Sequence, residues 1–74
     1  MPERQKELQD LAKADSDIAK AERVVAEQVA LIKHLADRGQ STAEAEAVLR
    51  NFEDTLEVFR GHRTLIVDTL RRSS

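Results

Sequence analysis

The sequence lacks cysteine and contains few residues that interrupt helices. Its 74 residues include no Cys, one Pro and two Gly. Without Cys, neither a disulfide framework nor a thiolate metal site can supplement the core of so short a chain. Charged residues make up 35% of the sequence, which is typical of long, solvated helices when Gly and Pro are this scarce. Disorder is the alternative for such a composition, but the apolar periodicity described below favours helices.

Aromatic residues and long apolar runs are also scarce. Aromatics make up 3% of the chain, and no run approaches the ~20 apolar residues that cross a bilayer. The segment Met1–Lys6 lacks the apolar region of a signal peptide, so we expect a cytoplasmic protein with no membrane association. The formal net charge is −2 and is divided evenly between the two halves. General nucleic-acid binding is therefore not expected, because it requires a basic excess.

The stretch from Asp37 to Glu44 combines a stop signal for one helix with a start signal for another. Gly39 can adopt the left-handed conformation that closes a helix C-terminus. Ser41 is a favourable N-cap, and Glu44 completes a Ser-x-x-Glu capping box. Because so few residues separate the signals, the flanking helices must fold back on each other. We expect a single domain over 1–74, with helices at about 3–38 and 42–72 and a turn at 39–41.

Both predicted helices carry an apolar stripe with heptad spacing. The first stripe comprises Leu11, Ala14, Ile18, Ala21, Val25, Gln28, Ile32 and Leu35. The second comprises Ala45, Leu49, Phe52, Leu56, Phe59, Arg63, Ile66 and Leu70. Facing positions in an antiparallel pair have a nearly constant sum, and pairing Leu35 with Ala45 gives sums of 80 or 81 along the whole stripe. The pattern predicts an all-α, coiled-coil-like antiparallel hairpin, with Phe52 and Phe59 on its seam.

Further apolar residues lie off these stripes and would be exposed on an isolated hairpin. They are Val24, Val29, Leu31, Val48, Val58, Leu65 and Val67. Self-association would bury them, so we expect a homo-oligomer, most simply a two-fold dimer that forms a four-helix bundle. An unidentified protein partner that covers the same surface is the alternative.

Two polar residues interrupt the stripes, and a glycine interrupts the second helix. We interpret Gln28 as a core residue that disfavours slipped pairings. Arg63 is expected to lay its methylenes on the seam and to pair with Asp15 or Asp17. Gly61 weakens the helix by ~1 kcal/mol relative to Ala; it marks either a close helix contact or a tolerated exposed position.

The densest positive charge follows Phe59. Candidate contacts for an anion or a partner are Arg60, His62, Arg63, Arg71 and Arg72. If these side chains are doubled across a dimer axis, they form a local basic patch despite the net charge. The ion pair expected of Arg63 is the competing interpretation for the centre of this cluster.

Catalytic, cofactor and metal sites are not expected. The two histidines, His34 and His62, would lie too far apart along the hairpin to share a metal within one chain, and no Glu-x-x-His motif accompanies either. The sequence contains no phosphate-binding loop, nucleophile elbow or zinc motif. A narrow helical bundle also lacks volume for a water-excluding active site. We therefore expect surface histidines and a protein that is not an enzyme.

Several segments carry a family resemblance. They are Asp17-Ile18-Ala19, Ala21-Glu22-Arg23, Ala26-Glu27-Gln28, Gly39-x-x-Thr42-x-x-Ala45-x-x-Val48-Leu49 and Phe59-Arg60-Gly61-His62-Arg63. Over roughly residues 15–70 the chain resembles a group of short, uncharacterised alphaproteobacterial helical-hairpin proteins. The resemblance implies a small bacterial helical protein and brings no catalytic residues.

Two functions follow as expectations. The first is a small non-enzymatic adaptor or regulator that acts through self-association and protein–protein contacts. The alternative is a nucleic-acid or phosphate-ligand binder that uses the region Arg60–Arg63 together with Arg71 and Arg72. A third, weaker interpretation is a subunit that is stable only with a different protein.

Overall fold

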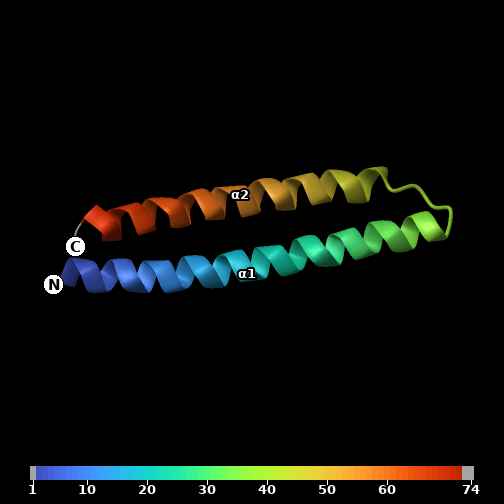
Figure 1. Cartoon of the computed structure of the whole chain (residues 1–74). Coiled ribbons are helices and arrows are strands. Elements are labelled where there is room, and N and C mark those ends of the chain that lie inside the picture. Colours follow the sequence, from blue (N-terminus) through green and yellow to red (C-terminus); the bar gives the residue numbers. More distant parts are fainter. Residues whose placement is uncertain (1, 73–74) are drawn as a thin grey trace.

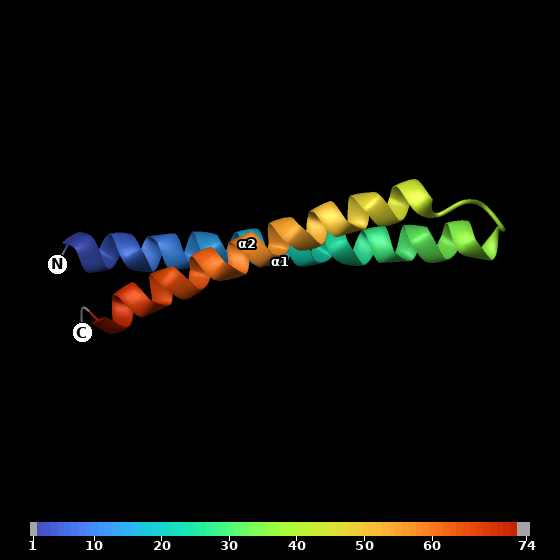
Figure 2. The same cartoon turned by 90° about the horizontal axis from the view of Figure 1, so that it is seen from above.

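The computed structural model describes residues 2–72, with side chains from residue 4 onward. It contains two helices, α1 (Pro2–Asp37) and α2 (Ala43–Arg72), and no strand in this part of the chain. They lie side by side and antiparallel (Figure 1), crossing at a shallow angle when viewed from above (Figure 2). The radius of gyration is 16.9 Å, against about 11 Å for a compact domain of this length. The predicted helical hairpin is confirmed, and it is a rod 57 Å long.

Gly39 ends α1 as predicted. Its φ of +69° is the only positive φ among the described residues. The N–H of Gln40 donates to the Leu35 carbonyl at 2.9 Å, and the N–H of Gly39 donates to the Ala36 carbonyl at 3.0 Å. These two bonds form a Schellman motif, which satisfies carbonyls that the helix end would otherwise leave open.

The start of α2 differs from the prediction by one residue. The N–H of Glu46 donates to the Thr42 carbonyl at 2.9 Å, so Thr42 holds the N-cap position. Ser41 precedes the cap, and its hydroxyl accepts a 3.4 Å hydrogen bond from the N–H of Ala43. The Ser41 hydroxyl thus satisfies one N–H of the first turn, as an N-cap side chain does. The capping box itself is not formed in the described chain, because the Ser41 hydroxyl binds Ala43 and not Glu44.

The seam between the helices follows the predicted stripes. Every residue of both stripes is buried or half-buried. Only four of the described residues are buried: Ala14, Ala45, Leu56 and Ile66. Two helices can cover only one side of each other, so the remaining seam side chains keep part of their surface in water.

The register of the pairing differs from the prediction by about one helical turn. Gln28 Nε2 donates to the Ala45 carbonyl at 2.9 Å. In the predicted register Gln28 faces Phe52, seven residues and ~10 Å away from Ala45, which is beyond the reach of a glutamine side chain. The end of α1 also runs past the first residue of α2 (Figure 1). The pairing sums of 80 and 81 are therefore too large at this end of the hairpin, where the Gln28–Ala45 contact gives 73. A shift of the stripe by one turn would place Ile32 rather than Leu35 opposite Ala45.

The slip follows from the stripe itself. Stripe positions alternate by three and four residues, so a shift of one turn moves each position onto another stripe position. Periodicity alone does not distinguish the two registers. The turn and the Gln28 hydrogen bond distinguish them, so the register role predicted for Gln28 is consistent with its contact.

Replacing Gly39 with Ala should destabilise the hairpin by about 1–2 kcal/mol, because an L-residue is strained at positive φ. A Cβ at this position meets no atom within 4 Å, so the expected loss comes from the backbone alone. Gly39→Asn should lose less, because Asn tolerates this conformation better. Urea unfolding at one protein concentration measures both variants, and equal midpoints for Ala, Asn and the wild type would contradict the assignment.

The register can be measured by disulfide formation, since the natural sequence has no Cys. A variant with Ile32→Cys and Ala45→Cys should form an intramolecular disulfide readily, because such a bond requires Cβ atoms about 3.5–4.5 Å apart. A matched variant with Leu35→Cys and Ala45→Cys should oxidise slowly. Faster oxidation of the second variant would instead support the register predicted from the sequence, in which Leu35 faces Ala45.

Candidate interaction surface

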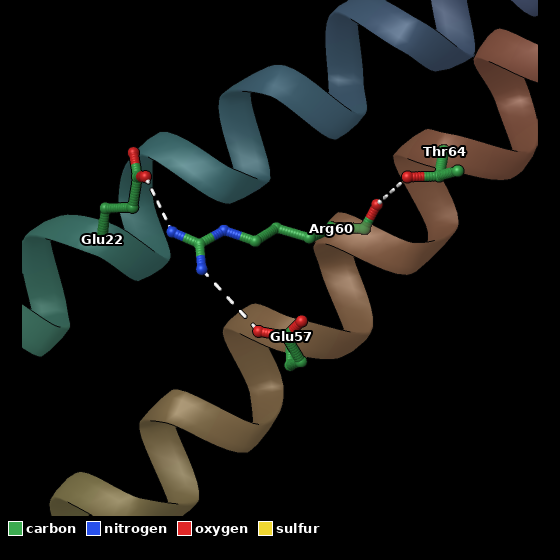
Figure 3. Close-up of polar contacts among 4 residues, drawn as sticks. All are labelled: Glu22, Glu57, Arg60 and Thr64. Carbon is green, nitrogen blue, oxygen red and sulfur yellow. Dashed lines mark hydrogen bonds and ion pairs between the residues drawn. The ribbon is translucent and has the colours of Figure 1, made fainter.

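One side of the hairpin is held by ion pairs between α2 and α1. The Arg60 guanidinium lies 3.3 Å from Glu22 of α1 and 3.7 Å from Glu57 of its own helix (Figure 3). The hydroxyl of Thr64 donates to the Arg60 carbonyl at 3.1 Å. Arg60 is therefore shared between two carboxylates rather than free to grip an anion.

Arg63 extends the same side. Its Nε donates to Asp15 Oδ1 of α1, which confirms the predicted ion pair and selects Asp15 from the two acids considered. Asp17 instead receives the Lys13 ammonium at 3.0 Å. Both central arginines of the candidate basic cluster are thus bound to acids of the neighbouring helix.

The other candidate basic residues lie apart from this pair. His62 is exposed and falls between Arg60 and Arg63 in sequence, so the helix turns it to a different side. Arg71 and Arg72 are exposed in the last turn of α2, about three turns beyond Arg60. The five side chains are therefore spread along α2 within a single hairpin rather than gathered into one patch.

An open groove of about 430 Å³ runs between the helices near their middle. Ala21 and Val24 line it from α1, and Phe52, Thr55 and Phe59 line it from α2, with Asp17 and Lys20 also in the lining. The Thr55 hydroxyl donates to the Asn51 carbonyl at 3.0 Å. Because that hydroxyl already donates within α2, Thr55 offers the groove no free hydrogen-bond donor. Phe52 and Phe59 do lie on the seam as predicted, but half-buried, so their outer edges belong to the groove.

Exposed apolar side chains lie on both helices, some beside the groove and some on the ion-paired side. Six of the seven predicted off-stripe residues are exposed: Val24, Val29, Leu31, Val48, Val58 and Leu65. Val67 is a correction, because it is half-buried beside the seam residue Ile66. Leu8 is also exposed, and sequence reasoning missed it. It lies one heptad before Asp15, and this spacing could have placed it on the outer edge of the seam.

Among the described residues there is neither a metal-binding cluster nor a membrane-spanning helix. No three His, Asp or Glu side chains there lie close enough together to hold a metal ion. His34 and His62 are both exposed. Neither described helix has an apolar stretch long enough to traverse a lipid bilayer.

Comparison with protein-family models, curated proteins and solved structures gives no match for this chain. The resemblance noted from the sequence therefore stays a prediction. The interaction surface has to be interpreted from its own residues.

The Arg63–Asp15 pair should contribute little stability. Both side chains are about half exposed, at 43% and 53%, and exposed pairs are typically worth about 0.2–1 kcal/mol. A double-mutant cycle with Arg63→Ala and Asp15→Ala should give a coupling in this range that shrinks as salt is added. The more exposed Lys33–Asp37 pair serves as a control with a smaller coupling. A salt-independent coupling of several kcal/mol would contradict this account.

Proposed function

We propose that this protein is a small, non-enzymatic adaptor or regulator that acts through self-association and protein–protein contacts. The observation that carries the proposal is the amount of apolar surface on the hairpin. Exposed large apolar residues lie on both helices, and their number is high for a chain with so few buried side chains.

The total accessible surface supports the same conclusion. The chain exposes 5656 Å², whereas a compact monomer of this mass exposes about 4,600 Å². A second copy would bury part of the difference and complete a four-helix bundle, the usual way in which antiparallel hairpins form a closed core. Two-fold homodimers are also the commonest closed assemblies, which favours a second copy over a different protein.

The alternative function, binding of a nucleic acid or a phosphate ligand, has less support. Arg60 and Arg63 are bound to carboxylates, so an incoming phosphate would have to displace Glu22 and Asp15. The net charge of −2 adds no general attraction to a nucleic acid.

As predicted from the sequence, we place the protein in the cytoplasm of a bacterium of the group that it resembles.

Sedimentation equilibrium, with circular dichroism over the same concentrations, tests the proposal. We expect a highly helical dimer or tetramer at micromolar concentration. A helical monomer at every concentration would overturn self-association. A monomer with little helix at every concentration would indicate that a different protein covers the apolar surface. Retention of RNA, DNA or nucleotides at low salt would favour the alternative function.

A further inference from the structure

Lys20 differs from the other lysines of the described chain. Lys6, Lys13 and Lys33 each lie 3.0–3.9 Å from the aspartate four residues further along α1. The position four residues after Lys20 is Val24 instead. Lys20 is exposed and forms no ion pair with any described residue. Its ammonium is therefore left without a counter-charge, one turn from an apolar side chain.

This free ammonium lies at the rim of the groove. Lys20 and Val24 both line the groove from α1, with Ala21 between them in sequence. Phe52 and Phe59 line it from α2. The small side chain of Ala21 leaves the space between the two rings open to a side chain from outside the hairpin.

The remaining polar groups of the lining are already bound. Asp17 is the one carboxylate among the lining residues, and it receives the Lys13 ammonium at 3.0 Å. The Thr55 hydroxyl donates to the Asn51 carbonyl at 3.0 Å. The groove therefore offers apolar walls and one free positive charge, with no free negative charge. Its complement is a large apolar group with a carboxylate close by.

Exposed apolar side chains extend this surface along α2. Val58 lies three residues after Thr55 and is 68% exposed, and Leu65, one heptad further on, is 63% exposed. Val48, also exposed, lies one heptad before Thr55. From Val48 to Leu65 the surface is about 25 Å long, which is about five turns of a helix and longer than a small-molecule site. The groove lining and these three residues are here called the groove face.

The positions that border the groove have the spacing of a helix-binding surface. On each helix they recur every three and four residues, the spacing at which one helix receives the side chains of another. They are Asp17, Lys20, Val24, Glu27 and Leu31 on α1, and Val48, Asn51, Thr55, Val58, His62 and Leu65 on α2. A third helix can therefore lie along the groove.

We infer that the groove face binds one amphipathic helix of a partner protein, and that the flank of this helix next to α1 is acidic. The inference rests on the proposed protein–protein contacts and names the chemistry of the partner. A large apolar side chain of the helix fills the groove between Phe52 and Phe59. A carboxylate one turn away pairs with Lys20, as Asp17 pairs with Lys13 in the preceding heptad. Apolar contact supplies most of the affinity, and Lys20 selects the charge of the flank.

Two synthetic helical peptides of three heptads are suitable probes. They share one leucine stripe and differ only in their flanking residues, which are Glu in one peptide and Lys in the other. Fluorescence anisotropy of each labelled peptide, titrated with the full chain at low salt, measures the Kd. The acidic peptide should bind at least about threefold more tightly. The protein's net charge of −2 acts in the opposite direction, so general attraction does not produce this preference.

Three variants locate the contact, with helicity followed by circular dichroism. Lys20→Glu should reverse the preference between the peptides. Lys33→Glu is the matched control and should preserve it: Lys33 precedes His34, which continues the row of Lys20, so Lys33 is turned about 100° away from that row. Val58→Ser should weaken both peptides alike, by about fivefold or more, because it removes apolar contact without changing charge.

The outcomes separate this inference from the proposed function. Tighter binding of the basic peptide, or an unchanged preference in Lys20→Glu, would overturn the acidic flank. Binding of neither peptide by a chain that sedimentation equilibrium shows to be a homo-oligomer would overturn the inference and leave the proposed function intact. Binding of neither peptide by a monomeric chain would overturn both.

Discussion

The left-handed backbone at Gly39 is the constraint on which the rest of the structure depends. Its φ of +69° allows the Schellman bonds that end α1 and turn the chain sharply. The reversal brings two long helices into contact over nearly their whole length (Figure 1). Each helix can then bury its stripe against the other, and helices in proteins gain most of their stability from such packing.

A seam between only two helices is open on both sides, and the two sides differ in chemistry. On one side, carboxylates of α1 meet Arg60 and Arg63 of α2 across the seam. On the other, the groove and its neighbouring apolar residues have no intrachain cover. Ion pairs between exposed side chains add little stability but fix orientation. The uncovered apolar side is the natural place for a contact between molecules, which is why the proposed function starts from it.

The difference between the two sides also explains why we favour an apolar contact over an anion site at the basic residues. A cluster that looks like an anion site in the sequence is divided once the chain folds. Arg60 and Arg63 turn toward α1 and its acids, whereas His62 turns to another side of the helix. Positive charge committed to register and orientation is less available for a ligand, so the contact proposed here is apolar rather than electrostatic.

The sequence by itself determined the two helices, the reversal at Gly39 and the identity of the seam residues, because capping signals and heptad spacing are local properties. It also indicated which apolar residues would remain exposed, with Val67 and Leu8 as exceptions. Only the tertiary structure decided the register, since a slip of one turn leaves a heptad stripe on itself. It likewise decided the cap at Thr42, the choice of Asp15 for Arg63, and the separation of an ion-paired side from an apolar groove. These depend on how far one helix lies along the other, which no local pattern encodes.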